Sequence, residues 1–530
     1  MVKGVVAWAV RAVFGIALFV LASIFLASLF RQSFLPLDGN EIPEISSMGI
    51  PQFLVVVGIV LSVVGMVAVL SRIRAHHLFL GVSLCLVLTG VFLISHFDPQ
   101  MRADALFTFQ AGEAFLRGDY QSFKPGGYMH MYPHQLGLMY YYILGMTVFS
   151  GAYWLYALNL LWLIVANFYL WQIVRHTSGG NSYAQTGAIV LPAIFVPHLL
   201  FIFFGYNHLP ALALFLAALY YLVRFLDGTC ERCWILGVVL VTLACVIRPN
   251  YSIGVIAIGC VYLAALLKAP SLRKAASALV LIASVTLVPA ALQASTRQVT
   301  GLEASEGLPS LSWLAMGFQD SRTDAEFFTL RQGALPGWYN GYPEALWRDS
   351  GYNSAAAQEQ ARQDFSTAVH LRISSPDHGL RFLATKAQST WLDPMFQAVW
   401  ASDVPADRPG FSQGLVRELY SGGSLYVAVT MAMRGVLVFI YGFGALELMR
   451  RLRSDQGTLM RAAPLSVALF MVGGFLFHLL WETKALYVYS YVYIGIILAT
   501  IGCAAVLPRC LSTVAHWRKQ TGRRESRLLP

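Results

Sequence analysis

The amino-acid sequence predicts an all-α protein that crosses a membrane many times. Hydrophobic residues make up 57% of its 530 residues and charged residues only 12%, and its mean hydropathy is +0.60. A water-soluble chain of this length needs more charged surface than this composition supplies. Apolar stretches of about 20 residues, the length that crosses a bilayer, recur from one end of the chain to the other. We therefore treat residues 1–530 as a single membrane domain.

The apolar stretches predict about 12 transmembrane helices. The segment 234–248 is shorter than the others, and we count it as a span. Residues 135–149 are also apolar but short, so their path through the membrane has to be decided from charge. The other expected spans are residues 12–30, 51–70, 78–96, 152–174, 184–204, 208–226, 251–267, 275–293, 424–447, 463–481 and 485–507.

Lys and Arg residues indicate how these helices are oriented, because they collect in cytoplasmic loops. If residues 135–149 dip into the membrane and return, basic pairs such as Arg72 with Arg74 and Arg450 with Arg451 fall on one side. If this segment crossed fully, every basic loop after Arg74 would fall on the opposite side from the first two. We therefore expect a re-entrant helix at 135–149 and both termini in the cytoplasm.

Two long external regions follow from this topology: residues 97–151, which contain the re-entrant helix, and residues 294–423. The second region holds 14 acidic and 10 basic residues, although the whole chain carries a net charge of +10. The positive charge therefore lies in the predicted cytoplasmic loops and tail, where anionic lipid head groups attract it, and it does not indicate nucleic-acid binding. Apolar spacing in the second region predicts an amphipathic helix at 354–373 and another helix at 378–400.

The seven cysteines do not predict a disulfide framework, because none of them lies in either large external region. Cys230 and Cys233 form a C-x-x-C pair in a short loop that we expect to be cytoplasmic. A zinc site would need a second pair or nearby histidines, which the sequence does not supply. We therefore expect no redox or metal function for this pair.

Asp104 is the first candidate for a catalytic group. It follows the outer end of an expected span, beside Arg102, and Asp98 is the reserve candidate. A carboxylate at such a boundary can accept the proton of a hydroxyl nucleophile, and partial burial raises its pKa toward the working range. The alternative interpretation is that Asp104 only caps a helix starting at Ala105, because Asp is a favoured residue at that position.

Residues that could hold an anion lie at the same outer face. Tyr132, Pro133 and His134 open the predicted re-entrant helix, whose N-terminus would offer free amides and a positive dipole to a phosphate. A simple capping turn is the alternative. Arg248 lies at the outer end of the span 234–248, where an arginine must pair or reach the interface.

The junction of the last two expected spans adds His478, Glu482 and Lys484. Glu482 and Lys484 could simply neutralise each other, as charges at such depth usually do. The topology, however, places Lys484 and Arg248 on the same face as Asp104. Cations beside an acid at the level of the lipid head groups favour a site for a lipid-linked phosphosugar.

The order of these motifs resembles that of the integral-membrane glycosyltransferases of the GT-C superfamily, in particular bacterial members distantly like protein mannosyltransferases and the lipid A aminoarabinose transferase. The resemblance covers most of the chain. It includes an acid in the first large external loop followed by GDY and YPHQLGL, the RPN triplet at Arg248, and WETKALYVYSY around Lys484. The elements in the large external loop are Met316, Gly337 to Tyr342, Tyr352, Lys386, Trp391 and Asp393.

This resemblance implies a GT-C-like bundle that transfers a monosaccharide from a polyprenyl-phosphate donor to a cell-envelope glycan, lipid or protein. It also implies a bacterial cytoplasmic membrane with the active site on the extracytoplasmic side. Asp104 then matches the general base, and Arg248 and Lys484 match positions that face the donor phosphate. In many relatives the acid follows the first span, so Asp98 could be the equivalent residue. The sequence has no D-x-D triplet, so we expect no metal and no other cofactor.

Other functions fit the composition as well. A lipid-linked oligosaccharide flippase or transporter would need polar groups deep within its spans and often has repeated halves, and neither is evident. A polysaccharide polymerase or ligase would rely on Arg and His residues rather than on an acid. A structural scaffold for wall assembly would need no catalytic group.

Overall fold

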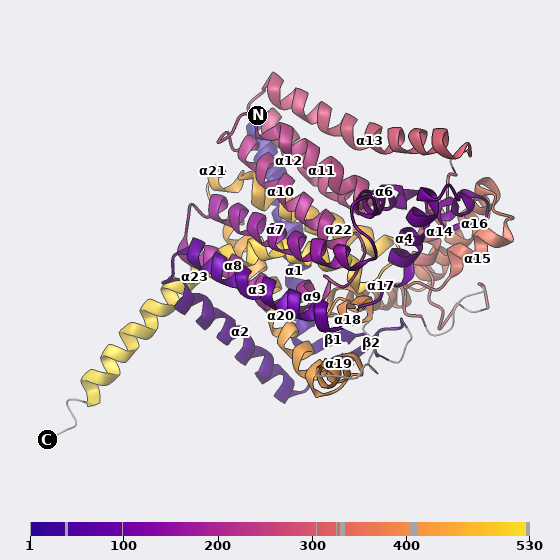
Figure 1. Cartoon of the computed structure of the whole chain (residues 1–530). Helices are drawn as coiled ribbons and strands as arrows, with labels where there is room; N and C mark the ends of the chain where they lie inside the picture. Colours follow the sequence, from indigo (N-terminus) through magenta and orange to yellow (C-terminus); the bar gives the residue numbers. More distant parts are fainter. Residues whose placement is uncertain are drawn as a thin grey trace.

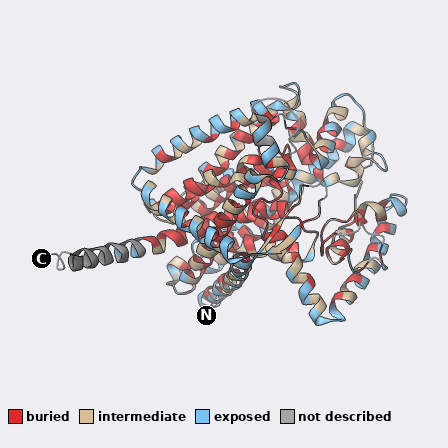
Figure 2. Ribbon diagram, turned by 90° about the horizontal axis from the view of Figure 1, so that it is seen from below, coloured by how far each residue is buried: buried red, intermediate tan, exposed pale blue. Residues whose placement is uncertain are grey.

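The computed structural model describes residues 2–37, 41–97, 99–303, 305–324, 326–328, 334–402 and 412–525. The protein is 77% helical and nearly all-α. Long helices pack side by side into a bundle, and shorter helices gather at one end of it, on the right of Figure 1. Buried residues fill the centre of the bundle, whereas many residues of the outer helices are exposed (Figure 2).

Ten helices in the described part of the chain are long and apolar enough to cross a membrane, which makes this a multi-pass membrane protein. Their order follows the expected spans, and most ends differ by a few residues, but α1 begins ten residues earlier than expected and α23 ends 18 residues later. They are α1 (Val2–Phe30), α2 (Ile50–Leu70), α3 (Ala75–Phe97), α7 (Tyr153–Thr177), α10 (His208–Leu226), α12 (Ser252–Lys268), α13 (Leu272–Thr300), α20 (Ser424–Leu452), α22 (Ala462–Leu480) and α23 (Ala485–Glu525).

The expected span 184–204 is not one helix. It consists of α8 (Ser182–Ile194) and α9 (Val196–Leu200), which are separated at Phe195. Pro197 has no backbone N–H to donate to a carbonyl of the preceding turn, so α8 cannot continue past Phe195, and a new helix begins there with Pro197 in its first turn. The segment expected at 234–248 is α11 (Cys233–Ile247), which is shorter than the ten long helices.

The long helices differ in how far they are surrounded by protein. In the most apolar stretch of α23, 89% of residues are buried, whereas in that of α13 only 11% are. Helix α23 packs against α8, α20 and α22. Helix α13 lies at the edge of the bundle in Figure 1, where its apolar side chains can contact lipid. Thus α23 is a central helix and α13 a peripheral one.

The shorter elements build the end of the molecule on the right of Figure 1. A two-stranded antiparallel sheet pairs Arg31 with Ser47. The segment 97–151, which was expected to be external, contains α4, α5, α6 and two single turns, and the segment 294–423 contains the end of α13 and α14 to α19. The elements are β1 (Arg31–Phe34), β2 (Glu44–Ser47), α4 (Ala103–Leu116), η1 (Gln121–Phe123), α5 (Tyr128–Met131), η2 (Pro133–Gln135), α6 (Leu136–Met146), η3 (Pro249–Tyr251), α14 (Ser310–Gly317), α15 (Tyr342–Asp349), α16 (Ser354–Ile373), α17 (Pro376–Trp391), α18 (Ala398–Ser402) and α19 (Ser412–Tyr420), with α21 (Gln456–Leu459) at the other end.

The external helices confirm one prediction and correct another. Helix α16 spans Ser354–Ile373, as the apolar spacing predicted. The helix expected at 378–400 is divided into α17 and α18. Between them the Asp393 carboxylate accepts hydrogen bonds from the amides of Met395 and Gln397, at 2.8 and 3.1 Å. Asp393 therefore stabilises a turn where a continuous helix was expected.

The loop after α10 corrects a second expectation. Cys230 and Cys233 are joined by a disulfide, whereas we expected no disulfide in this chain. The C-x-x-C spacing places their Cα atoms 5.5 Å apart, within the range that a disulfide bridges.

Helix α6 is held tightly against the bundle. A Cβ atom at Gly137 would overlap the carbonyl oxygen of Val246 near the end of α11, so only glycine allows this approach. The contact fixes the segment that precedes α6, including Tyr132 and His134, relative to Arg248 directly after α11.

Candidate functional site

Asp104 lies in the first turn of α4 and does not have the role of a helix cap. The helix begins at Ala103, one position before Asp104, and its cap residue Arg102 makes no side-chain capping bond. The Asp104 carboxylate instead accepts a hydrogen bond from the Tyr128 hydroxyl at 3.0 Å. Ala103 has a left-handed backbone with φ of 49°, a strained conformation of the kind that is concentrated at functional sites.

Asp104 is exposed to solvent, yet desolvation by the surrounding protein raises the pKa of its carboxyl. The positive charge of Lys484 and the hydrogen bond from Tyr128 act in the opposite direction, and the charge of Glu41 adds to the increase. A reachable carboxylate with a raised pKa has the properties of a general base.

Lys484 lies beside Asp104 and is paired with Glu41, a residue that the sequence did not single out. Its Nζ is 3.3 Å from both carboxylate oxygens of Glu41 and 4.7 Å from the ring centre of Tyr339. Burial alone would lower the pKa of Lys484, but the charges of Glu41, Glu482 and Asp104 together raise it. Lys484 is therefore a cation surrounded by acids.

Glu482 is not the ion-pair partner of Lys484, which removes the alternative that these two residues only neutralise each other. The carboxylate of Glu482 is buried and accepts a hydrogen bond from the Tyr487 hydroxyl at 3.3 Å. Burial raises its pKa to about 8, against the effect of Lys484. The nearby Lys386 has its pKa lowered to about 7 by burial, against the effect of Glu482. Glu482 is thus mostly protonated at neutral pH.

His478, near the end of α22, contacts the loop that contains Glu482. It is buried, and its Nδ1 hydrogen-bonds the backbone carbonyl of Glu482 at 3.4 Å. The contact holds the backbone of the loop between α22 and α23, so His478 is a positioning residue.

Arg248 is buried at the end of α11, where snorkelling to the interface was the simplest expectation. Its Nη1 donates to the amide oxygen of Asn207 at 3.2 Å, and no carboxylate of the described residues is within ion-pair distance of it. Arg248 also lines a small cavity with Tyr251, Tyr487 and Ser490. A buried guanidinium without an acid partner is available to an anionic ligand.

Tyr206 connects Arg248 with Asp104. Burial and the charge of Asp104 raise the pKa of the Tyr206 phenol, whereas a hydrogen bond from Gln135 and the charge of Arg248 lower it. Because both charges act on one side chain, Asp104 and Arg248 both lie near Tyr206.

Tyr132 and His134 lie at the turn η2, between α5 and α6. Tyr132 donates a hydrogen bond to Glu344 of α15, and its ring is 5.9 Å from that of His134. Burial lowers the pKa of His134 to about 4, so this histidine is neutral. No side-chain hydrogen bond caps η2. The structure therefore does not support the alternative that the residues at Pro133 form a simple capping turn.

Arg102 contacts the large external region. Its guanidinium lies 4.1 Å from the ring centre of Trp400 and donates to the Trp400 carbonyl at 3.0 Å. The Nζ of Lys484 is 5.9 Å from the same ring. Trp400 thus connects the two cations by cation–π contacts. Asp98, the reserve candidate, lies outside the described residues.

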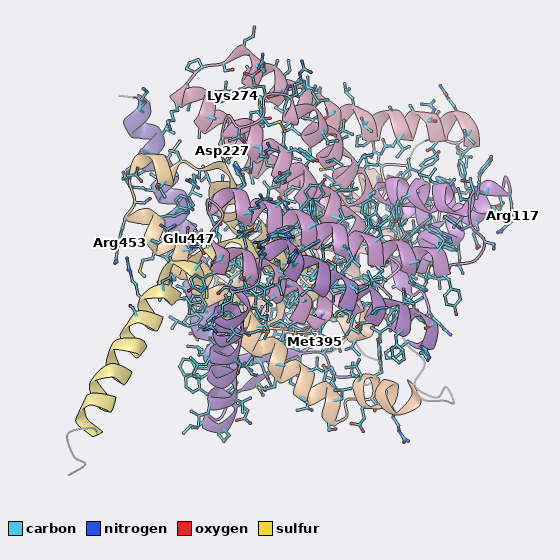
Figure 3. All side chains as sticks on the ribbon, turned by 60° about the vertical axis from the view of Figure 1, so that its left-hand side comes forward. Arg117, Asp227, Lys274, Met395, Glu447 and Arg453 are labelled. Atoms are coloured by element: carbon cyan, nitrogen blue, oxygen red, sulfur yellow. A yellow bond between two sulfur atoms is a disulfide. The ribbon has the colours of Figure 1, made fainter. Side chains whose placement is uncertain are left out.

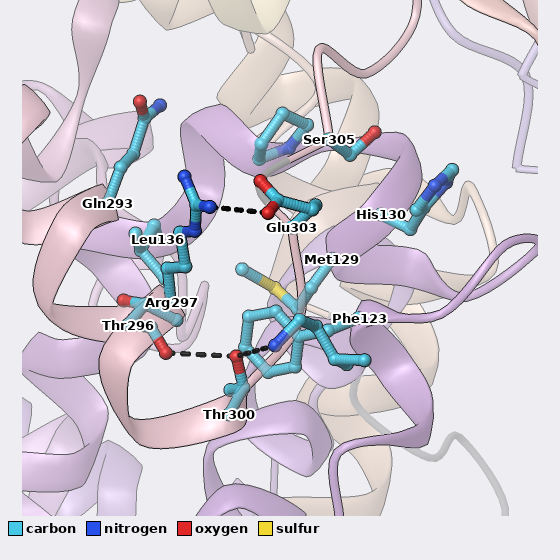
Figure 4. Close-up of a pocket in the computed structure, with 12 residues that line it drawn as sticks. Phe123, Met129, His130, Leu136, Gln293, Thr296, Arg297, Thr300, Glu303 and Ser305 are labelled. Atoms are coloured by element: carbon cyan, nitrogen blue, oxygen red, sulfur yellow. Dashed lines mark hydrogen bonds and ion pairs between the residues drawn. The ribbon is translucent and has the colours of Figure 1, made fainter.

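A separate pocket lies between α13 and the segment from η1 to η2, and Figure 4 shows Arg297 paired with Glu303 there. Met129 and Pro133 form part of its wall. It contains neither Asp104, Arg248 nor Lys484, so we do not include it in the site.

Neither metal ligands nor known relatives identify this site. Among the described residues, no group of three or more His, Cys, Asp or Glu side chains could hold a metal ion. No protein-family model matches the chain, and neither a curated protein nor a solved structure matches it.

Proposed function

We propose that this protein is a glycosyltransferase of the GT-C type, which moves a monosaccharide from a polyprenyl-phosphate donor to a cell-envelope acceptor outside the cytoplasmic membrane. The observation that carries the proposal is the proximity of an exposed carboxylate, Asp104, to the cation Lys484, whose charges act on each other. Arg248 adds a second positive charge, and its charge and that of Asp104 both act on Tyr206.

The proposed topology has about 12 spans, both termini in the cytoplasm and one re-entrant helix. The ten long helices supply most of the spans. Helix α11 supplies another, and α8 with α9 supplies an interrupted one. Helix α6 is the re-entrant helix, and its tight contact with α11 at Gly137 supports this assignment.

The chemistry follows from the charges. An acceptor hydroxyl attacks the anomeric carbon of the donor sugar while the Asp104 carboxylate takes its proton. The bond from the anomeric carbon to the phosphate oxygen breaks, and the polyprenyl phosphate leaves with that electron pair. Lys484 and Arg248 stabilise the negative charge that develops on the leaving phosphate. The step as written requires no cofactor. The Asp104 carboxylate accepts the proton, and Lys484 and Arg248 offset the negative charge of the leaving phosphate.

The position of the charged groups favours an enzyme over a transporter. Arg434, in α20, donates to the Gln32 amide oxygen at 2.6 Å and is thereby tied to β1 at the outer end. Glu447, in the same helix, binds Arg450 and Arg451 near the other end. A transporter would need such groups near the bilayer midplane.

The test is transfer by the purified full-length protein, supplied with a panel of synthetic polyprenyl-phosphate hexoses and pentoses. Release of free polyprenyl phosphate is measured with envelope extract as the source of acceptor. The Asp104→Asn variant should lose at least about 100-fold in rate, the usual effect of removing a general base. The control is Asp119→Asn, whose carboxylate accepts a backbone amide in the same external region at 3.0 Å.

Wild-type rates in Asp104→Asn would refute this assignment of the base. Loss of transfer in Asp98→Asn alone would move the role to Asp98. No release with any donor in the panel would count against the transferase itself.

A further inference from the structure

The other end of the bundle contains a groove that the proposed reaction does not use. Helices α20 and α23 pack along each other and come closest at Gly502. A Cβ atom there would overlap the carbonyl oxygen of Phe443, so glycine is needed for this contact. Past this contact, toward the C-terminal ends of both helices, a groove of about 430 Å³ opens between them.

The groove has an apolar part and a basic part. Each helix contributes residues at helical spacing, so that one stripe of α20 faces one stripe of α23. The apolar part is formed by Leu446, Met449, Ala505 and Val506, and the basic part by Arg450, Arg453 and Arg509. The apolar part is nearer the centre of the bundle, and the arginines lie where the groove ends.

The arginines give the groove an excess of positive charge. Arg450 is already engaged, because its Nε and Nη2 bind the Glu447 carboxylate at 2.7 and 2.8 Å. The same carboxylate also accepts from Arg451 at 2.7 Å. Arg453 is exposed, and no acidic side chain of the described residues forms an ion pair with it. Figure 3 shows Glu447 and Arg453 at the end of the molecule opposite Arg117.

We propose that this groove binds an anionic phospholipid, with one acyl chain between α20 and α23 and the phosphate at Arg453 and Arg509. The arginines lie at the ends of two helices that are long and apolar enough to span a membrane, where lipid head groups are expected. A basic site next to an apolar groove between such helices matches a lipid that carries both a negative charge and a chain. This inference does not depend on the proposed transferase activity.

The test measures thermal unfolding of the full-length protein in a neutral detergent. Dioleoyl-phosphatidylglycerol should raise the melting temperature, and dioleoyl-phosphatidylcholine should raise it far less. In the double variant R453Q/R509Q, the affinity for phosphatidylglycerol should fall roughly 30-fold, because each basic residue adds about the same favourable increment. The matched control is R72Q/R74Q, which removes two exposed arginines from the turn between α2 and α3.

A second variant tests the apolar part without changing charge. Ala505→Phe fills the groove and should weaken phosphatidylglycerol binding while leaving the arginines in place. Native mass spectrometry counts the bound lipid and keeps the test informative if one variant is poorly stable. An equal loss in R72Q/R74Q would show diffuse attraction and overturn the proposal. An equal thermal shift with inorganic phosphate, or full binding by Ala505→Phe, would overturn the acyl-chain site.

Discussion

The hydroxyl of Tyr128, in α5, donates a hydrogen bond to the carboxylate of Asp104, in α4, at 3.0 Å. Burial raises the pKa of Asp104, whereas this bond lowers it. Tyr128 therefore influences the pH at which Asp104 ionises. The relationship gives the most direct test of the role of Asp104.

The first prediction concerns Tyr128→Phe. Loss of the hydrogen bond removes a stabilising partner of the ionised carboxylate, so the pKa of Asp104 should rise further. The acidic limb of the pH profile of kcat/KM for sugar transfer should then move to higher pH, by about 1 unit. Tyr120→Phe is the control, because its ring packs on Phe115 at 5.4 Å in the same region. An unmoved acidic limb would show that Asp104 does not control this ionisation.

The second prediction concerns Lys484→Gln. Without this cation, Asp104 loses the charge that lowers its pKa, and the donor phosphate loses a charge-assisted hydrogen bond. Affinity for a synthetic polyprenyl phosphate should fall about 10- to 100-fold, measured by isothermal titration in detergent. Lys124→Gln, at an exposed position of the first external region, should bind as the wild type does. Equal affinities in both variants would contradict a phosphate contact at Lys484.

The sequence predicted that Asp104 and Lys484 lie at the same end of the molecule, but it did not predict which residue forms an ion pair with Lys484. Counting basic loops was enough to place Asp104 and Lys484 at the same end, because topology depends only on charge and span number. The partner of Lys484 could not be predicted, since Glu41 lies in the loop joining the first two spans and no pattern connects positions 443 residues apart. Its only signal was a carboxylate in a short external loop.

Local backbone chemistry explains the other differences. Asp104 was a plausible helix cap by residue type, but α4 starts at Ala103 in a left-handed conformation that apolar spacing does not reveal. The break between α17 and α18 occurs at Asp393, whose carboxylate captures two backbone amides. At Asp393, side-chain bonds to the backbone thus overrode helical periodicity.

The third prediction concerns stability and pH at Glu482. Its pKa is about 8 in the folded protein and about 4.5 when it is unfolded. Between these values the folded state binds more protons than the unfolded state does. The contribution of Glu482 to stability therefore decreases as the pH rises from about 4.5 to about 8, and it is constant above pH 8. Glu482→Gln should remove this dependence and melt at a higher temperature than the wild type at pH 8. The difference should be at least about 1 kcal/mol and should vanish near pH 4.5.

Thermal unfolding across this pH range measures the effect. Glu303→Gln is the matched control, because the Glu303 side chain is 79% exposed. The two variants should diverge as the pH rises. Parallel curves would mean that Glu482 is ionised in the folded protein at neutral pH, and the protonated carboxyl inferred here would be wrong.

The fourth prediction concerns Gly137→Ala in α6. The added methyl group would meet the backbone carbonyl of Val246, which cannot rotate away as a flexible side chain can. Helix α6 must then shift from α11, at a cost of about 1–3 kcal/mol, the usual range for overpacking. Because this contact fixes the segment with Tyr132 and His134 relative to Arg248, transfer should fall more than the melting temperature alone explains. Gly112→Ala is the control, since its Cβ would lie 3.5 Å from Ile143, an ordinary contact between α4 and α6. If the two variants were equally stable and equally active, α6 would not be packed on α11 as described.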